Sequence, residues 1–372
     1  MDSLKLKILI IIPSADFSNS GIAKSVMLYY KHIDKSDICI DFLTNNRMPE
    51  VIRKEIEDNG SKTFEVFGRN KHPLKYVKEL RGILFSNQYD IVHIHGNSCI
   101  LAIELYAAKK AGVEVRIAHS RNTTCHNLLF HKMLRPLFNR SYTHAFACGE
   151  DAGKWLFHNK PFIVVPNGKN IDKFKYDQAV RDEYRKKYFL ENKKVIGHVG
   201  SFSEQKNHTF LIDTFFELKK INPECMLVLL GDGHLETAIK QKADKMGIGD
   251  SVLFAGQSTE IEKWMQVIDI LVLPSKYEGL PNVIIEGQIA SLTCLVSDNV
   301  TREAKITNLV IFMPLEAGAL AWAEKLNNIE LIDRNESSQN ITIQVAEAGY
   351  DIVKNAEWLK MLYFNLSNGG PH

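Results

Sequence analysis

Two carboxylates, Glu278 and Glu286, stand in the segment SKYEGLPNVIIEG (275–287). The apolar run before it, IDILVLP (268–274), predicts a buried strand. The pattern after it predicts a helix with Pro281 at its first position, where no N–H is needed. One carboxylate therefore follows a strand in a short loop, and the other lies inside a helix. This pattern predicts a ligand site, in which helix amides contact an anion and Glu286 accepts hydrogen bonds from vicinal hydroxyls such as those of a ribose.

A lysine and a glycine turn follow two other predicted strands. Lys206 lies in VGSFSEQKNH (199–208), where the next helix is expected to begin, and GDG (231–233) is a tight turn. Because ligands of parallel α/β sheets bind at the carboxyl ends of the strands, these turns are expected at one site. An amide-rich helix start together with a lysine predicts a diphosphate site that needs no metal ion.

Several commoner motifs are missing from the sequence. No Gly-x-Gly-x-x-Gly follows the first apolar run and no P-loop pattern occurs, which argues against a dinucleotide site and a P-loop nucleotidase. No Asp-x-Asp pair occurs, and the histidines lack metal-ligand spacing. We therefore expect no metal and no cofactor. Nucleic-acid binding is not expected either, because the basic half lacks interleaved aromatic residues.

Apolar strand patterns alternate with amphipathic helix patterns along the chain, which predicts parallel, doubly wound α/β sheets. A charged, tyrosine-rich stretch interrupts the alternation, which then starts again, so two Rossmann-like domains that face a central cleft are expected. The final stretch is amphipathic and follows no strand, which predicts a terminal helix. The expected parts are a first domain (1–166), a connector (167–190), a second domain (191–345) and a C-terminal helix (346–372).

Composition is that of an ordinary soluble globular protein, and the charge is unevenly divided along the chain. The six cysteines are scattered and form no Cys-x-x-Cys pair, which is typical of reduced thiols in a cytoplasmic protein. Residues 1–165 carry a net charge of +7 and residues 166–372 one of −5. A basic first half favours a lipid surface or a phosphorylated acceptor, although a solvated basic face explains it equally well.

A series of segments in a fixed order resembles the retaining glycosyltransferases of family 4, which have the GT-B fold. The likeness extends over nearly the whole chain, and bacterial enzymes of capsule and exopolysaccharide assembly are the most similar. The segments are YDIVHIHG, RIAHSRN, ACGEDAGKWLF, VVPNGKNIDKF, GHVGSFSEQKNHTFLIDTF, GDGHLE, VLFAGQSTEIEKWMQVIDILVLPSKYEGLP and AGYDIVKNAEWL. The spacing from Glu278 to Glu286 resembles the paired-glutamate motif of the family.

The resemblance implies a role for each matching residue. Glu278, His119 and Lys206 are the catalytic candidates: Glu278 holds the donor sugar, His119 lies near it, and Lys206 neutralises the departing diphosphate. Glu286 binds the ribose. Further donor contacts are expected from Gly279, Leu280, Pro281, Asn282, Ser201, Gly21, Phe254 and Gly256. The first domain would bind the acceptor, the second the nucleotide sugar, and the C-terminal helix would cross back to the first domain.

Two positions depart from the family pattern. Ser201 stands where the family often has arginine, and Ser20 precedes Gly21 where the family often has a second glycine. Loss of the arginine removes one of two cations from the leaving group, and charge-assisted contacts to phosphate are the strong ones. Arg121 and Lys24 are candidates to replace it; the alternatives are slow turnover or an inactive chain.

The expected activity is metal-independent, retaining transfer of a hexose or N-acetylhexosamine from a UDP-sugar to a hydroxyl of a lipid-linked glycan acceptor. Two alternatives stay open: a nucleotide-sugar epimerase of the same architecture, and a non-catalytic nucleotide-sugar-binding subunit of a partner transferase. The basic, apolar segment from His126 to Arg140 is either an ordinary packed helix or a contact with an anionic membrane. The protein is accordingly expected in the cytoplasm or at the inner face of the plasma membrane.

Overall fold

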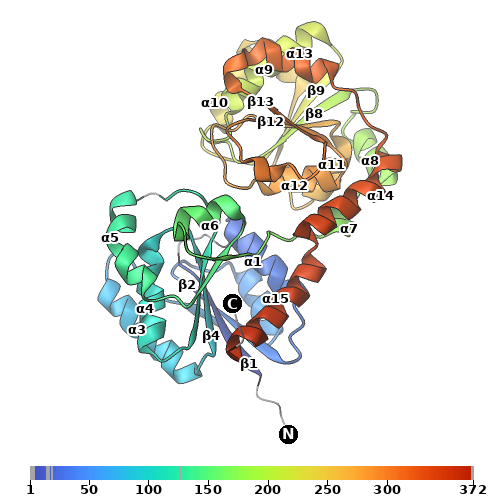
Figure 1. Ribbon diagram of the computed structural model, residues 1–372. Helices are drawn as coiled ribbons and strands as arrows, with labels where there is room; N and C mark the ends of the chain where they lie inside the picture. The colour runs from blue at the N-terminus through green and yellow to red at the C-terminus, as the bar shows by residue number, and fades with distance from the viewer. Residues whose placement is uncertain (1–4, 14–16, 18–19, 126, 370–372) are drawn as a thin grey trace. The chain divides into compact units, whose positions relative to one another are not determined.

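The computed structural model describes residues 5–13, 17, 20–125 and 127–369. The chain divides into two compact units (Figure 1). Unit 1 comprises residues 1–169 and 350–372, and unit 2 comprises residues 170–349. The stretch 167–190, predicted as a connector, lies almost wholly in unit 2, where it forms the helices α7 (Ile171–Phe174) and α8 (Gln178–Lys187).

Unit 1 is built on a seven-stranded parallel sheet with the order β3-β2-β1-β4-β5-β6-β7. Its central strand β1 is apolar throughout, and successive side chains enter two different cores: Ile8 and Ile10 pack on one face, Leu9 and Ile11 on the other. Both faces are therefore covered, as parallel sheets require. The strands are β1 (Leu6–Ile12), β2 (Ile38–Thr44), β3 (Thr63–Glu65), β4 (Ile91–Gly96), β5 (Val115–Ser120), β6 (His144–Ala147) and β7 (Ile163–Val164).

Helices cover the two faces of this sheet in two groups. The last helix, α15 (Ile352–Ser367), packs with α1 (Gly21–His32) in the first core, so the prediction that the C-terminal helix returns to the first domain is confirmed. The second core lies under the helices α3 (Pro73–Asn87), α4 (Ala102–Lys110), α5 (Leu128–Asn139) and α6 (Glu150–Phe157). A further helix, α2 (Glu50–Asp58), follows β2, and the short turn η1 (Cys99–Leu101) precedes α4.

The C-terminal helix, predicted to start at residue 346, begins only at Ile352. The chain forms α14 (Arg334–Val345) and α15, separated by a π-type turn, η5 (Ala346–Tyr350). Gly349 in this turn has a φ of 86°, which favours glycine. Asp351 then caps α15, because its side chain accepts a hydrogen bond from the Val353 N–H at 2.9 Å.

Unit 2 repeats the doubly wound design on a six-stranded parallel sheet with the order β10-β9-β8-β11-β12-β13. The predicted strand runs of this half all form strands, which confirms two parallel α/β sheets in the chain. The strands are β8 (Lys194–Val199), β9 (Cys225–Leu230), β10 (Val252–Gly256), β11 (Ile270–Leu273), β12 (Thr293–Ser297) and β13 (Val310–Met313). The helices are α9 (His208–Ile221), α10 (Glu236–Lys245), α11 (Ile261–Val267), α12 (Asn282–Ile289) and α13 (Gly318–Asn328), with short turns η2 (Gly249–Ser251), η3 (Arg302–Ala304) and η4 (Leu315–Ala317).

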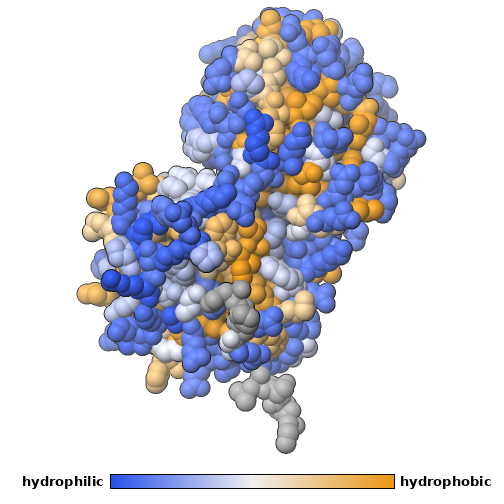
Figure 2. Space-filling model, in the orientation of Figure 1, coloured by the Kyte–Doolittle hydropathy of each residue, from blue (hydrophilic) through white to orange (hydrophobic). Residues whose placement is uncertain are grey.

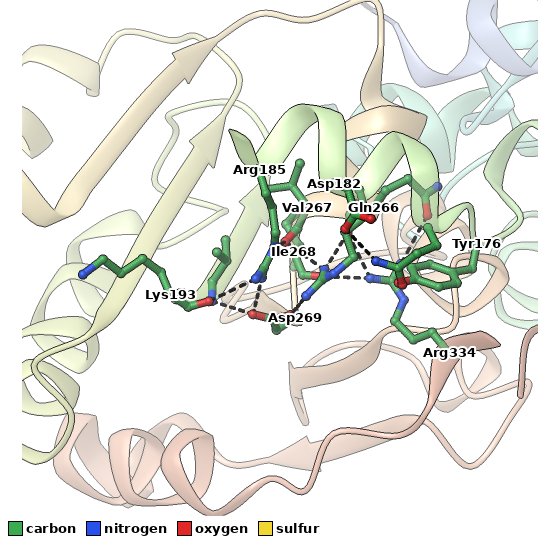
Figure 3. A network of polar contacts seen from close by, with 12 residues as sticks. Tyr176, Asp182, Arg185, Lys193, Gln266, Val267, Ile268, Asp269 and Arg334 are labelled. Atoms are coloured by element: carbon green, nitrogen blue, oxygen red, sulfur yellow. Dashed lines mark hydrogen bonds and ion pairs between the residues drawn. The ribbon is translucent and has the colours of Figure 1, made fainter. Parts of the chain in front are cut away.

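A buried group of three arginines around one carboxylate joins α8, α11, α14 and β11 (Figure 3). Arg181 and Arg185 both pair with Asp269, the latter at 2.5 Å. Arg334 donates to backbone carbonyls after α11 and α12, including that of Ile268 at 3.0 Å. These cations satisfy carbonyl groups that a helix end leaves without intrahelical partners. Burial lowers the pKa of Arg334 to about 9.

Candidate active site

Lys206 and Glu278 meet at the carboxyl edge of the unit 2 sheet. Lys206 lies in the loop after β8 and Glu278 in the loop after β11, two adjacent strands. The Lys206 Nζ lies 2.5 Å from the Glu278 Oε1, and the Ser275 hydroxyl donates to the same oxygen at 2.9 Å. The side chains of Lys206 and Glu278 are 17% and 10% exposed. The structure thus brings together two of the predicted residues as a largely enclosed ion pair.

The two loops are also joined by backbone contacts, which hold this pair in place. The Lys276 N–H donates to the Gln205 carbonyl at 2.8 Å, and the Gln205 side chain donates to the Tyr277 carbonyl at 3.0 Å. The GDG turn after β9 packs against the first loop. A Cβ on Gly231 would lie 2.2 Å from the Gly200 carbonyl oxygen, and Gly231 has a φ of 137°, so the turn requires glycine there.

The start of α12 carries the second predicted carboxylate. The helix begins at Asn282, so the prediction that Pro281 is its first residue is wrong by one position: Pro281 is the cap residue. Glu286 is half-buried, one turn after Asn282, whose Oδ1 is buried without a hydrogen-bond partner among the described residues. Gly279 and Leu280 are half-buried in the loop before the helix. The amides and side chains at this helix start can bind an anion and hydroxyl groups.

The other predicted donor residues of unit 2 surround these loops. Ser201 is exposed, and its hydroxyl lies 3.4 Å from that of Ser203. Phe254 is stacked at 6.1 Å on Phe202, and the Gly256 carbonyl accepts a hydrogen bond from the Gly231 N–H at 2.9 Å. No contact of Ser201 with the Lys206–Glu278 pair is found among the described residues. Their roles in donor binding stay predictions.

Two buried histidines pack behind Lys206. The His198 Nδ1–H donates to the Val272 carbonyl at 2.8 Å, and His208 stacks on Phe202 at 4.1 Å. Burial, followed by the charge of Lys206, lowers the pKa of His208 to about 4. Burial and the neighbouring His208 lower the pKa of His198 well below its ordinary value. Lys206 is therefore supported by neutral rings rather than by further charges.

In unit 1, His119 belongs to a buried hydrogen-bonded chain. Its Nδ1 lies 3.0 Å from the His93 Nε2, and its Nε2 lies 3.2 Å from the Arg121 Nη1. The chain continues from the His93 Nδ1 to the Tyr363 hydroxyl on α15 at 2.7 Å. Both ring nitrogens of His119 are thus engaged, and the half-buried Arg121 is the more accessible group. The predicted catalytic role of His119 stays a prediction. Its link through His93 to Tyr363 has no local signal in the sequence, because His93 and Tyr363 are 270 positions apart.

Gly21, the predicted phosphate-contacting glycine, is the exposed first residue of α1. The Ser20 hydroxyl caps this helix, accepting a hydrogen bond from the Ile22 N–H at 3.1 Å. The helix cap therefore explains why serine stands at position 20, where the family often has glycine. Lys24, proposed from the sequence as a replacement cation, is exposed on the first turn of the same helix.

Three of the buried histidines of unit 1 lie close enough to share a metal ion. Ring nitrogens of His93, His95 and His119 lie within 4.8 Å of one another. The Arg121 guanidinium bonds one of these rings and would repel a divalent cation, so we expect no metal at this cluster. A cavity of about 20 Å³ beside the rings is large enough for one water molecule.

Acidification from pH 7 to pH 5 should destabilise the protein. Burial, followed by Arg121, lowers the pKa of His93 to about 3. Because unfolded histidine titrates near about 6.5, the unfolded chain takes up protons first; stability is complete above that pH and falls as the pH drops toward the folded-state pKa. His93 and His208, whose pKa values are both low in the folded state, should each lower the free energy of unfolding by about 2 kcal/mol at pH 5. Urea unfolding at pH 7, 6 and 5 measures how the free energy of unfolding depends on pH, and this dependence should be weaker in His208→Phe. A free energy of unfolding that does not change with pH would contradict the low pKa values of these buried histidines.

The architecture, two doubly wound parallel sheets, is that of the GT-B fold, and solved structures of this class match it. One is the Anabaena protein Alr3699/HepE in complex with UDP, with a TM-score of 0.75 and 16% identity over 96% of this chain and 99% of that one. Residues 180–340 match the family model of the group 1 glycosyl transferases.

Curated relatives extend the match over the whole chain. The Bacillus subtilis (strain 168) protein EpsF, described as a glycosyltransferase, is 32% identical over 388 residues, covering 100% of both chains. The Escherichia coli UDP-Gal:α-D-GlcNAc-diphosphoundecaprenol α-1,3-galactosyltransferase is 25% identical over 320 residues, covering 79% of this chain and 80% of the relative. The chain belongs to the group 1 glycosyltransferase family. In the described part of the chain, no helix is both long and apolar enough to cross a membrane.

Proposed function

We propose that the protein is a retaining glycosyltransferase that moves a hexose or N-acetylhexosamine from a UDP-sugar to a hydroxyl of a lipid-linked glycan acceptor during capsule or exopolysaccharide synthesis. The observation that carries the proposal is the enclosed Lys206–Glu278 pair beside the start of α12, with Glu286 one turn into the helix. The E. coli relative, whose name states a UDP-sugar donor and a lipid diphosphate acceptor, supports this choice of substrates.

In the proposed reaction, the bond between the anomeric carbon and the UDP oxygen breaks while the acceptor oxygen bonds to the same face of that carbon. The acceptor proton passes to the departing phosphate oxygen. Negative charge grows on the diphosphate, where Lys206 and the amides at the start of α12 would stabilise it without a metal ion. Glu278 would accept hydrogen bonds from sugar hydroxyls, and its pairing with Lys206 and Ser275 fixes its orientation.

The test is a panel of UDP-sugars with purified protein and EDTA present, read by thermal shift and UDP release. One UDP-sugar should raise the melting temperature, and Glu286→Ala should weaken its binding by at least about tenfold, since charged hydrogen bonds to the ribose are lost. Glu324→Ala, which removes an exposed glutamate of α13, is the matched control and should bind normally.

The same panel separates the alternatives. UDP release that depends on an added glycan acceptor supports transfer. Conversion of the UDP-sugar into an isomer without acceptor would identify an epimerase, and binding without turnover on any acceptor would support a non-catalytic subunit. Absence of binding by every nucleotide sugar would refute the assignment of this site.

We also propose that α5 contacts an anionic membrane. His126 lies outside the described residues, but the rest of the predicted segment forms α5. Its buried face consists of His131 and Phe138, whereas Leu129 and Met133 are 67% and 62% exposed. Figure 2 shows hydrophobic side chains at the surface in the region of α5. Exposed apolar residues beside an exposed Lys132 favour a surface of anionic lipid.

Flotation with phosphatidylglycerol-containing vesicles tests this contact against vesicles of phosphatidylcholine alone. Replacing both Leu129 and Met133 with glutamate should weaken binding more than about tenfold, because two apolar side chains lose their burial. Leu320→Glu, at a 53% exposed site on α13, is the control and should float like the parent protein. Equal flotation of all variants would show that α5 is an ordinary packed helix.

A further inference from the structure

Arg121 is a half-buried cation with only neutral hydrogen-bond partners among the described residues. It follows the last residue of β5, at the carboxyl edge of the unit 1 sheet. Its Nη2 donates to the Asn167 Oδ1 at 2.8 Å, and its Nη1 donates to the His119 Nε2 at 3.2 Å. The same Asn167 oxygen also accepts a hydrogen bond from the Ser25 hydroxyl at 2.9 Å.

Two other enclosed arginines of the chain pair with carboxylates, whereas Arg334 and Arg116 donate to backbone carbonyls. Arg69 pairs with the buried Glu104 at 2.5 Å, and Arg185 pairs with Asp269. A buried charge is costly unless it is paired, so a guanidinium held by an imidazole and an amide still lacks an anion. Among the described residues, no carboxylate lies within ion-pair distance of Arg121.

The hydrogen bonds behind Arg121 run in one direction. A guanidinium only donates, so the His119 Nε2 accepts and the neutral ring carries its proton on Nδ1. That proton is donated to the His93 Nε2, and the His93 Nδ1–H is donated to the Tyr363 oxygen. The low pKa values of both histidines keep the rings neutral. The hydrogen bonds from Tyr363 through His93 and His119 therefore orient the Arg121 guanidinium without neutralising its charge.

We propose that the Arg121 guanidinium binds a phosphate group of a substrate, and that His119, His93 and Tyr363 position it. The inference rests on the proposed function, which supplies substrates that carry diphosphates. Ligands of parallel α/β sheets bind at the carboxyl edge, where Arg121 lies, and guanidinium groups match phosphate geometry. Two substrates contain such a phosphate group: the nucleotide-sugar donor and a lipid-linked acceptor, each through its diphosphate.

Arg121→Gln is tested with matched ligands that differ only in phosphate. If Arg121 binds the donor, the Kd for UDP rises about 10- to 100-fold and that for uridine is unchanged. If it binds the acceptor, the Kd for UDP stays constant, while the KM rises for a glycan on a lipid diphosphate but not for the same glycan on a neutral alkyl group. Either result supports the proposal. No change in either arm would overturn it.

Further variants separate binding from folding. Arg116→Gln removes a half-buried arginine of β5, which donates to the Ser141 carbonyl at 2.7 Å. It should change neither the Kd for UDP nor the KM for the lipid diphosphate acceptor. Arg121→Lys keeps the charge and should retain affinity within about tenfold. Tyr363→Phe should raise whichever constant Arg121→Gln raises, the Kd for UDP or the KM for the acceptor, by about 3- to 10-fold. It should leave uridine binding unchanged, which loss of packing alone does not predict.

Inorganic pyrophosphate distinguishes a failure of this proposal from a failure of the proposed function. If the parent protein binds no UDP-sugar, the function assignment fails, but inorganic pyrophosphate still reports on Arg121. Binding of pyrophosphate by the parent and by Arg116→Gln, with at least about tenfold loss in Arg121→Gln, supports the phosphate site. Equal pyrophosphate affinity in all three proteins would overturn it.

Discussion

Replacing Lys206 with alanine should lower the kcat for sugar transfer by about 10²- to 10³-fold, because removal of one preorganised charge from a developing oxyanion has effects of this size. In the free protein the ammonium is held by Glu278 at 2.5 Å, so it is oriented before any substrate binds. Charge on the departing diphosphate grows only as the sugar bond breaks. The effect should therefore fall mainly on kcat, with a smaller change in the Kd for UDP.

A neighbouring lysine provides a matched control for this experiment. Lys276 joins the same two loops through an ion pair with Glu204 at 3.3 Å, but these side chains are 48% and 74% exposed. Lys276→Ala should leave kcat within about twofold, because exposed pairs contribute little. Steady-state rates and thermal melting of both variants are compared. A loss of less than tenfold in Lys206→Ala, with the fold intact, would refute a role for Lys206 at the leaving group.

Replacing Asp269 with asparagine should destabilise unit 2 by about 3–5 kcal/mol, since removing one partner of a buried ion pair leaves the other charge uncompensated. The carboxylate balances Arg181 and Arg185, and its Oδ2 also accepts a hydrogen bond from the Val195 N–H at 2.8 Å. Arg334 lies in the same group (Figure 3). Loss of Asp269 thus leaves the Arg181 and Arg185 guanidinium groups without their carboxylate partner, beside the further cation of Arg334.

Hydrogen exchange followed by mass spectrometry localises this effect. Protection should fall in α8, α11 and β11, while the strands of unit 1 keep theirs, because the network lies wholly within unit 2. Glu217→Gln breaks a surface pair with Lys220 and should change the free energy of unfolding by less than about 1 kcal/mol. Uniform loss of protection over the whole chain would argue against a local role for Asp269.

The strands of both sheets were predictable because their residues are buried on both faces. LKILIII and CMLVLL are continuous apolar runs, and such runs separated by amphipathic helices indicate parallel sheets. The edge strand β3 (Thr63–Glu65) was missed, since its three half-buried residues carry no such pattern. The late start of α15 at Ile352 was missed as well, although Gly349 and Asp351 are the local signals of a turn and a helix start.

The positions of Lys206, Glu278 and Glu286 in unit 2 could also be inferred in advance. Each follows or begins a predicted element, and the carboxyl ends of parallel strands lie along one edge. The sequence alone therefore determined two doubly wound sheets, a helix start after β11, and a lysine and a glutamate at the carboxyl ends of two strands. It did so because these features depend on local pattern and on the fixed direction of parallel strands.

Only the tertiary structure decided which side chains touch. The Lys206–Glu278 pair spans 72 positions, the Arg185–Asp269 pair 84, and the His93–Tyr363 hydrogen bond 270. No local pattern encodes such pairings, because they depend on which helix packs on which strand. The physical consequence is clearest at His119. The family resemblance implied a contact with the donor sugar, whereas the return of α15 to unit 1 completes a buried series of hydrogen bonds that leaves Arg121 as the accessible charge.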